Sequence, residues 1–171
     1  MHPSHPFWSQ EVPRVDGQLL LTPCPGTQQV ALPLALGQLK LAGAHGVLTL
    51  MTDAELARLE LGRLGQQIEA AGMRWFQLPI EDDQAPDAAF EAAWRRALPD
   101  LVGLLRDGKH VIHCKGGSGR TGLVAAALLM SLGQPQQEAM TAIRAHRPKA
   151  FTLACHRQWL DGLAARLAEG D

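Results

Sequence analysis

Runs of apolar residues alternate along the chain with amphipathic stretches, and each kind predicts a different element. Short apolar runs are typical of buried strands, and they occur at residues 18–22, 47–51, 74–80 and 109–113. Stretches with apolar residues three or four positions apart predict helices, and they cover residues 30–44, 52–71, 88–106, 121–132, 135–146 and 153–169. Strands and helices therefore follow one another through most of the chain.

Local signals mark the ends or interruptions of several elements. Asp16-Gly17 lies between two apolar segments and predicts a hairpin turn. Thr52, with Glu55 three positions later, forms a capping-box pattern that indicates the start of a helix. Pro99 lies inside a helical stretch, and we expect it to kink or divide that helix.

The alternation of strands and helices predicts a single α/β domain. Such an order favours a central, mostly parallel twisted sheet flanked by helices on both faces. Residues 1–11, rich in proline and histidine, predict a flexible N-terminal arm, which leaves residues 12–171 as the folded domain. A chain of 171 residues is long enough to bury one substantial core.

The composition is typical of a soluble globular protein and narrows the range of partners. Hydrophobic residues make up 46% of the chain, and the net charge of −1 argues against a broad nucleic-acid-binding or polybasic membrane surface. No apolar run approaches the ~20 residues of a membrane-spanning helix, and the N-terminus lacks a signal-peptide pattern. Three cysteines without a zinc spacing fit a reducing compartment, so we expect a cytoplasmic protein.

One stretch, HCKGGSGRTG at residues 113–122, combines a thiol, an arginine and several glycines where a strand leads into a helix. Glycines allow successive backbone N–H groups to converge, and the start of a helix adds positive potential. An arginine supplies a planar fork that can hold two oxygens of one phosphate. These features predict a site for a tetrahedral dianion, and its residues are Lys115, Gly116, Gly117, Ser118, Gly119 and Arg120.

Cys114 begins this loop, where the same dipoles favour a thiolate over a thiol. A thiolate at the base of a phosphate cradle can attack phosphorus in line and form a cysteinyl-phosphate, which water then hydrolyses. The backbone N–H groups and Arg120 would stabilise the equatorial oxygens of the transition state. We expect Thr121 to donate its hydroxyl to the sulfur and His113 to brace the loop through hydrogen bonds.

Other interpretations of the loop involve no such chemistry. A buried cysteine is often inert packing, and a glycine-rich turn often only connects two elements. An ATPase phosphate loop would need Gly-Lys-Ser/Thr, but here Arg120 follows Gly119. The joint pattern of His-Cys, five spacer residues and Arg-Thr-Gly favours a catalytic loop over each of these alternatives.

The stretch HCKGGSGRTG resembles the H-C-x5-R-[S/T]-G signature of the cysteine-based protein phosphatases. The resemblance is to the dual-specificity branch, and within it to the kinase-associated, cyclin-dependent-kinase-inhibitor-type phosphatases. It runs over roughly residues 20–165 and includes the stretches VLTLMTDAEL, PIEDDQAPD and AIRAHRPKAF. It implies the cysteine phosphatase fold, hydrolysis of phosphotyrosine or phosphoserine/threonine in proteins without a cofactor, and, by analogy alone, a kinase partner.

Cleavage of a phosphoester also calls for an acid that protonates the leaving oxygen, and the loop LPIEDDQAPD offers several carboxyl groups. The family pattern P-I-x-D implies Asp82 as this acid, and Asp83 is the alternative. Asp87 is better explained as the N-cap of the next helix. The segment I-R-A-H-R-P resembles a structural arginine pair of the family, which implies that Arg147 supports the loop; a solvated charge at a helix end is the alternative.

The substrate and the class of activity stay open at this level. Lys115 gives the loop a charge found in lipid phosphatases of the same superfamily, so a phosphoinositide or another non-protein phosphate is an alternative to a phosphoprotein. A module that binds phosphate without turnover and a kinase inhibitor that acts by surface contact are further alternatives. The histidines show no metal-binding spacing, and we expect no metal. Cys24 or Cys155 could pair with oxidised Cys114 if the fold brings either one close.

Overall fold

Five strands form one sheet at the centre of the structure, a computed structural model that describes residues 3–170. They are β1 (Trp8–Glu11), β2 (Gln18–Thr22), β3 (Ala44–Thr49), β4 (Arg74–Gln77) and β5 (Lys109–His113), in the spatial order β1-β2-β5-β3-β4. Strands β2 to β5 run parallel, whereas β1 pairs antiparallel with β2 at one edge. The sheet is therefore mixed, and its larger part is parallel as the sequence predicted.

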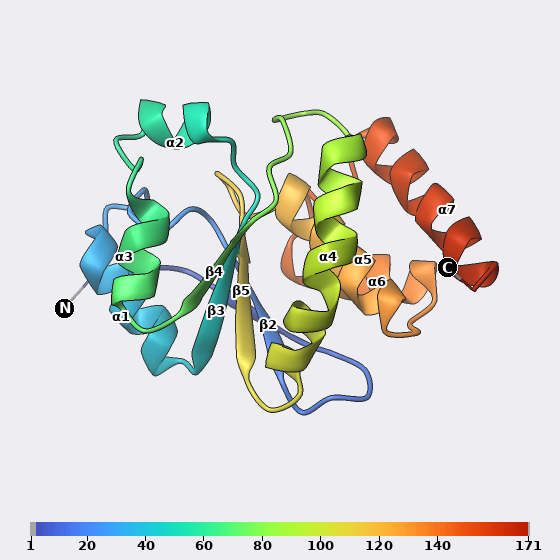
Figure 1. Cartoon of the computed structure of the whole chain (residues 1–171), viewed down its shortest axis with the longest axis horizontal. Helices are drawn as coiled ribbons and strands as arrows, with labels where there is room; N and C mark the ends of the chain where they lie inside the picture. Colours follow the sequence, from blue (N-terminus) through green and yellow to red (C-terminus); the bar gives the residue numbers. More distant parts are fainter. Residues whose placement is uncertain (1–2, 171) are drawn as a thin grey trace.

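Helices cover both faces of this sheet (Figure 1). On one side lie α1 (Leu32–Leu41) and α3 (Leu64–Ala70), with α2 (Asp53–Arg58) beyond the end of the sheet. On the other side lie α4 (Ala88–Leu105), α5 (Gly119–Ser131), α6 (Gln136–His146) and α7 (Ala154–Ala168). This arrangement confirms the predicted fold class, an α/β domain with helices on both faces.

Each face of the sheet contributes to its own hydrophobic cluster. In β3, Val47 packs in the cluster under α1 and α3, and Leu48 packs in the cluster under α4 and α5. In β5, Val111 and Ile112 divide between the two clusters in the same way. Successive side chains of a strand point to opposite faces, so a strand covered on both sides needs consecutive apolar residues. This explains why the central strands appear in the sequence as runs and not as an alternation.

The N-terminal segment differs from the flexible arm expected for residues 1–11. Trp8–Glu11 forms β1, which pairs with β2 along its full length, and His5 is only 1% exposed. Pairing satisfies the N–H and C=O groups that the outer edge of β2 would otherwise leave open. Asp16-Gly17 does not form a two-residue hairpin turn, because both backbone N–H groups donate to carbonyls near the end of α4.

The structure also corrects one helical prediction and narrows another. The stretch at residues 52–71 forms α2 and α3 and not one helix, because α2 ends at a turn in which Glu60 has a positive φ of 59°. The N–H of Leu61 then bonds back to the carbonyl of Leu56, which closes the helix end. Of the two effects expected of Pro99, a kink or a division, division is excluded, because α4 runs without interruption from Ala88 to Leu105.

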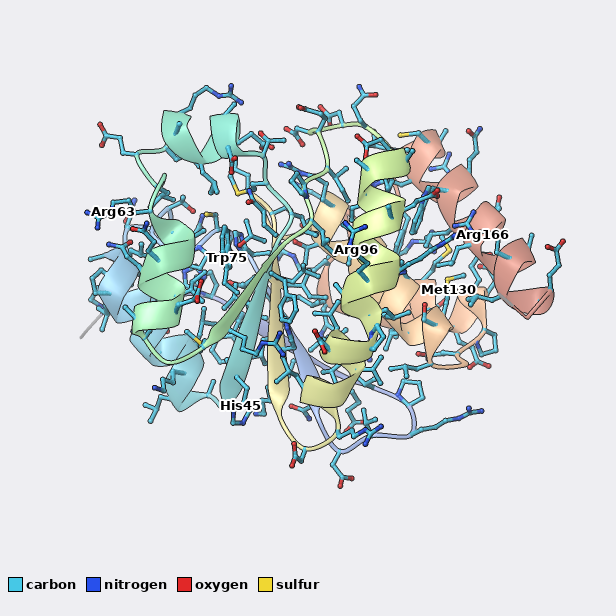
Figure 2. The ribbon with its side chains drawn as sticks, in the orientation of Figure 1. His45, Arg63, Trp75, Arg96, Met130 and Arg166 are labelled. Atoms are coloured by element: carbon cyan, nitrogen blue, oxygen red, sulfur yellow. The ribbon has the colours of Figure 1, made fainter. Side chains whose placement is uncertain are left out.

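Trp75 of β4 links the packing of the sheet to the loop after β5. Its ring lies between the sheet and α3 (Figure 2), where a Cβ added to Gly65 would come within 2.3 Å of it. Its indole N–H donates to the Thr49 hydroxyl at 2.9 Å, at the carboxyl end of β3. None of the helices formed by residues 3–170 combines the length and the apolar character needed to cross a membrane.

Candidate active site

The glycine-rich stretch lies at the carboxyl end of the parallel strands. It leaves β5 at His113 and enters α5 at Gly119. Segments that follow β3 and β4 at the same edge bring Glu55 and Asp82 to it, because parallel strands end on one side of their sheet. Three separate parts of the sequence therefore meet around Cys114.

The thiol of Cys114 is nearly buried and accepts two hydrogen bonds. The backbone N–H of Gly117 donates to Sγ at 3.3 Å, and the Thr121 hydroxyl donates to it at 3.1 Å. The residue is 4% exposed. Both donors favour a negatively charged sulfur, and Thr121 lies where the sequence predicted a donor to this atom.

Gly117 must be a glycine for two reasons that the structure makes visible. Its φ of 78° lies in the left-handed region, which side chains disfavour. A Cβ at this position would lie 2.6 Å from backbone atoms of Thr22 and Pro23. The loop is thus pressed against the end of β2, and this close approach helps to fix its shape.

Arg120 extends from the first turn of α5 and is almost entirely enclosed, with a side chain 3% exposed. Its Nη1 donates to Glu55 Oε1 at 2.7 Å and to the Ile80 carbonyl at 2.8 Å, and its Nη2 donates to Glu55 Oε2 at 2.9 Å. A guanidinium has five N–H donors. The second Nη2 proton and the Nε proton are left on one edge of the fork, which is the geometry that two phosphate oxygens require.

Glu55 has two roles, of which the sequence suggested only one. It completes the predicted capping box of α2, since its N–H donates to Thr52 Oγ1 and its carboxylate accepts from the Thr52 N–H. The same carboxylate holds Arg120. Burial acts to raise the pKa of Glu55, but the hydrogen bonds from Arg120 and Thr52 outweigh it and lower that pKa. The glutamate is therefore a carboxylate that neutralises the buried guanidinium.

Asp82 is positioned beside Arg120 and faces solvent. Its Oδ1 lies 3.4 Å from Arg120 Nη2, and its side chain is 64% exposed. The same oxygen accepts the backbone N–H of Asp83 at 3.1 Å, and Asp83 has a positive φ of 61°. Of the two aspartates, Asp82 is thus the one in contact with the loop arginine. Asp87 is the N-cap of α4, as predicted, and accepts from the N–H of Phe90.

His113 lies below the loop in a chain of hydrogen bonds that fixes its protonation state. Its Nδ1 is 3.1 Å from the Cys114 carbonyl, which can only accept, so Nδ1 carries the proton. Its Nε2 then accepts from the Thr49 hydroxyl at 2.7 Å, and that hydroxyl accepts from Trp75. Burial lowers the pKa of His113 to about 4. The imidazole is therefore neutral near neutral pH and braces the backbone at Cys114, which agrees with its predicted structural role.

The remaining residues of the predicted phosphate site line the mouth and the back of the loop. Lys115 lines a hollow of about 250 Å³ together with Met51, Arg58, Leu59, Glu55 and Asp82. Ser118 precedes α5, and its carbonyl accepts the N–H of Gly122 in the first turn. A Cβ at Gly116 or Gly119 would meet no atom within 4 Å. The backbone N–H of Gly117, two residues before α5, donates to the thiol, and the roles of the other loop N–H groups stay predictions.

Arg147 contacts the loop from behind. Its Nε donates to the Gly117 carbonyl and its Nη2 donates to the Gly116 carbonyl, both at 2.9 Å. Arg147 follows the last residue of α6, so a solvated helix-end charge was the alternative interpretation. The two hydrogen bonds instead agree with the expectation that it supports the loop.

Neither additional cysteine is arranged like Cys114. Cys24 is fully buried beside the loop, and its N–H donates to the Lys115 carbonyl at 3.0 Å. Burial, followed by the negative charges of Cys114 and Glu55, raises the pKa of Cys24 to about 12. Cys155 lies at the start of α7, with Sγ 3.9 Å from the Asp83 carbonyl. Cys24 is therefore a neutral packing thiol at physiological pH.

His156 is a site neighbour that the sequence did not reveal. Its Nε2 donates to the Gln84 carbonyl at 2.8 Å and so ties the loop that carries Asp82 to α7. Burial lowers the pKa of His156, against the opposing effect of this hydrogen bond.

In the sequence, Glu55 was recognisable only as a helix cap, although its place just after a strand end was a usable signal for a site residue. Within residues 3–170, no group of three or more His, Cys, Asp or Glu side chains is arranged to hold a metal ion.

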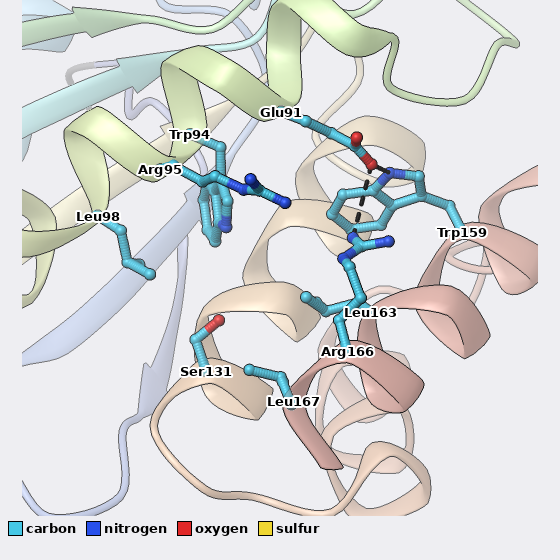
Figure 3. Close-up of a pocket in the computed structure, with 9 residues that line it drawn as sticks. All are labelled: Glu91, Trp94, Arg95, Leu98, Ser131, Trp159, Leu163, Arg166 and Leu167. Atoms are coloured by element: carbon cyan, nitrogen blue, oxygen red, sulfur yellow. Dashed lines mark hydrogen bonds and ion pairs between the residues drawn. The ribbon is translucent and has the colours of Figure 1, made fainter. Parts of the chain in front are cut away.

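A larger hollow, of about 430 Å³, lies away from the thiol between α4, α5 and α7 (Figure 3). Its walls are mostly leucine and tryptophan side chains. Glu91 of α4 contacts α7 across this hollow. Its Oε1 accepts from the Trp159 indole at 3.1 Å and lies 3.5 Å from Arg166 Nη2. This hollow contains none of the predicted site residues.

Residues 19–163 match a family model described as "Swiss Army Knife protein, DSP-PTPase phosphatase domain". Curated relatives include cyclin-dependent kinase inhibitor 3 of the rat, 34% identical over 104 residues, which is 58% of this chain and 48% of the rat protein. The human protein of the same name is 28% identical over 142 residues, which is 78% of this chain and 66% of the relative. The match thus spans about half the length of the rat relative.

Similar solved structures include a kinase associated phosphatase in which the catalytic site cysteine is substituted by serine. It superposes with a TM-score of 0.86, covers 98% of each chain and is 24% identical. The structural likeness shows a shared fold. The family match covers most of the chain, including the loop that contains Cys114 and Arg120.

Proposed function

This chain belongs to the DSP-PTPase phosphatase family, and from that premise we propose that it hydrolyses phosphomonoesters through a cysteinyl-phosphate intermediate. One observation carries the proposal above all others. The sulfur of Cys114 accepts the N–H of Gly117 and the hydroxyl of Thr121, and the enclosed guanidinium of Arg120 stands at the same loop, held by Glu55 on one edge and with Asp82 3.4 Å from Nη2 on the other. A nucleophile and a dianion receptor thus occupy one site.

In the first step the Cys114 thiolate attacks phosphorus in line, the S–P bond forms and the P–O bond to the leaving group breaks. Asp82 gives its proton to the departing oxygen, which makes the leaving group an alcohol. Arg120 and the loop N–H groups, including those of Ser118 and Gly119, hold the equatorial oxygens. Lys115 adds a positive charge at the mouth of the site.

In the second step water attacks the phosphorus of the intermediate and gives a proton to the Asp82 carboxylate, which restores the acid. The S–P bond breaks, inorganic phosphate forms and the sulfur leaves as a thiolate. The Thr121 hydroxyl, 3.1 Å from Sγ, donates to that thiolate and assists its departure. His113 and Arg147 act on the backbone of the loop and take no proton during turnover.

We assign phosphorylated proteins or peptides as the substrates, with tyrosine or serine/threonine phosphoesters, in the cytoplasm. Arg58 and Lys115 line the same hollow as Asp82 and give positive charges that acidic residues next to a phosphosite could contact. A kinase partner is proposed by analogy with the relatives' names. The same two charges could also receive the headgroup of a phosphoinositide, which a comparison of substrates distinguishes.

The test begins with p-nitrophenyl phosphate and the Cys114→Ser variant. We expect slow hydrolysis by the wild-type chain, none by the variant, and retained binding of tungstate or phosphopeptide by both. Mass spectrometry of a rapidly quenched reaction should show a phosphate adduct on Cys114 in the wild type alone. Hydrolysis by Cys114→Ser would exclude the covalent route.

A non-catalytic module gives a different pattern in the same assays. It would bind phosphopeptide tightly while neither the wild type nor the variant releases phosphate. A panel that contains phosphotyrosine peptides, phosphothreonine peptides and short-chain phosphoinositides then ranks the substrates by kcat/KM. A preference for the phosphoinositides would overturn the assignment of protein substrates. It would leave the proposed cysteinyl-phosphate mechanism unaffected.

A further inference from the structure

Trp8, in the N-terminal strand β1, is connected to the loop at Cys114 through a single arginine. The Cζ atom of Arg147 lies 4.0 Å from the centre of the Trp8 ring, which is a close cation–π contact. Arg147 in turn donates to the carbonyls of Gly116 and Gly117. Trp8 precedes the region at residues 19–163 that the family model matches.

The two carbonyl contacts determine where the loop N–H groups point. In a trans peptide the C=O and the following N–H lie in one plane and point in opposite directions. Arg147 holds the Gly116 carbonyl on the back of the loop, so the N–H of Gly117 points to the front, where it donates to Cys114 Sγ at 3.3 Å. The hold on the Gly117 carbonyl orients the N–H of Ser118 by the same geometry.

Glycine backbones need such an external restraint. Residues 116 and 117 have no Cβ, so their peptide planes can rotate through conformations that are closed to other residues. A rotated plane would turn the N–H of Gly117 away from the sulfur and present a carbonyl oxygen there. The Arg147 side chain prevents this only while it keeps its own position, and the face of the Trp8 ring is one wall of that position.

Trp8 is itself held firmly from two directions. Its backbone pairs with Leu21 in the β1–β2 ladder. Upstream, the N–H of His5 donates to Gln38 Oε1 at 2.8 Å, and Gln38 Nε2 donates to the Pro3 carbonyl at 2.9 Å. The N-terminal segment is therefore anchored on α1 and on β2, and it presents the indole as a fixed surface.

We propose that Trp8 is a positioning residue for the phosphate loop, which it acts on through Arg147. Its ring keeps the guanidinium in contact with the two glycine carbonyls, and this keeps the N–H of Gly117 directed at Cys114 Sγ. The inference rests on the proposed function in one respect only, namely that this loop is the phosphate cradle.

The test measures the reactivity of Cys114 and does not require turnover. The rate of Cys114 alkylation by iodoacetamide below neutral pH, followed on the Cys114 peptide by mass spectrometry, reports the stabilisation of the thiolate. Loss of the cation–π contact in Trp8→Leu should slow this alkylation by about 2- to 30-fold. If the chain turns over substrate, kcat should fall by a similar factor and KM should change less.

A graded series and a double-mutant cycle separate this effect from a loss of stability. Trp8→Phe and Trp8→Tyr keep an aromatic face and should lie between the wild type and Trp8→Leu. In an Arg147→Met background, replacement of Trp8 by leucine should change the alkylation rate by less than about 2-fold, because the connecting residue is gone. Trp159→Leu is the matched control, since it removes an indole whose centre lies 6.0 Å from Arg166 Cζ, in the hollow between α4, α5 and α7 (Figure 3).

Two outcomes would overturn the inference. One is a folded Trp8 variant whose Cys114 reacts as fast as the wild type. The other is an equal effect of Trp8→Leu with and without Arg147, which would mean that the two residues act independently. If Trp8→Leu fails to fold, the alkylation rates of Trp8→Phe and Trp8→Tyr are compared with that of the wild type. Slower alkylation supports the inference, and unchanged rates overturn it. Failure of the proposed function would appear differently, as absent hydrolysis with the coupling intact.

Discussion

Glu55 and Arg120 form a bidentate ion pair inside the protein, although 65 positions separate them in the sequence. Both carboxylate oxygens accept from the guanidinium, at 2.7 and 2.9 Å, and the arginine side chain is 3% exposed. A buried charge without a partner is costly. The glutamate therefore allows Arg120 to remain enclosed at the loop and sets which edge of the guanidinium faces the proposed phosphate.

Replacement of Glu55 by glutamine should damage both stability and activity. Removal of one member of a buried pair costs about 3–5 kcal/mol, so urea denaturation should show a large loss in the free energy of unfolding. We expect kcat/KM to fall at least about 10-fold, because the guanidinium loses its orientation. Thr52→Ala is the matched control: it removes the α2 cap at about 1 kcal/mol and leaves the ion pair. Equal effects of the two variants would show that Glu55 matters only as a cap.

Asp82→Asn should lower kcat by about 10²- to 10⁴-fold on substrates with poor leaving groups, since the asparagine cannot protonate an alkoxide. The effect should be smaller on p-nitrophenyl phosphate, whose leaving group departs without a proton. Asp83→Asn is the control, and asparagine also tolerates the positive φ of that position. Steady-state rates on an alkyl phosphate and on p-nitrophenyl phosphate make the comparison. A larger loss in Asp83→Asn would move the acid by one residue.

Gly117→Ala should destabilise the protein and disrupt the loop. The new Cβ would lie 2.6 Å from the backbone of Thr22 and Pro23, at a φ of 78°, and such overpacking costs on the order of 1–3 kcal/mol. Gly116→Ala is the matched control for stability, because its Cβ would meet no atom within 4 Å. Thermal unfolding and tungstate binding should both weaken in Gly117→Ala. Unchanged unfolding relative to Gly116→Ala would contradict the close packing of this glycine on β2.

Acid should destabilise the fold through its buried histidines. Burial lowers the pKa of His110, like that of His113, to about 4 from 6.5. Between these values the unfolded chain binds the proton and the folded chain does not, so the free energy of unfolding decreases as the pH falls. Each shift corresponds to a loss on the order of 3 kcal/mol that is complete near pH 4.

His110→Phe should reduce this pH dependence while it preserves the ring. The measurement is the urea midpoint of the wild type and the variant at about pH 7 and about pH 5. The control is Phe76→Leu, which removes the ring whose centroid lies 5.6 Å from that of His110 and should lower stability by the same amount at both pH values. A His110→Phe variant with the wild-type slope would show that His110 is not the titrating group.

Local sequence patterns predicted the elements whose boundaries depend on local chemistry. The strand at residues 109–113 and the Thr52–Glu55 capping box are confirmed, as is the N-cap at Asp87. Each depends on contacts between residues that are close in the chain. The prediction of one helix over residues 52–71 was wrong because Glu60 adopts a left-handed backbone conformation, which side-chain periodicity does not reveal.

The prediction of a flexible arm at residues 1–11 was wrong for a different reason. Nothing within residues 1–11 specifies a strand, and β1 exists because the outer edge of β2 offers unpaired backbone groups. Trp8 had no assignable role in the sequence, and its contact with Arg147 arises only when the segment lies on that edge. Short polar segments of this kind take their structure from their neighbours.

By itself, the sequence determined the alternating α/β order, the thiol and arginine of the loop between β5 and α5, and the family signature, because all of these are written in short contiguous stretches. The tertiary structure alone decided that Glu55 neutralises Arg120, that Asp82 and not Asp83 contacts it, and that Trp8 stands behind Arg147. The physical reason is that parallel strands bring their carboxyl ends to one edge, where residues far apart in the chain become neighbours.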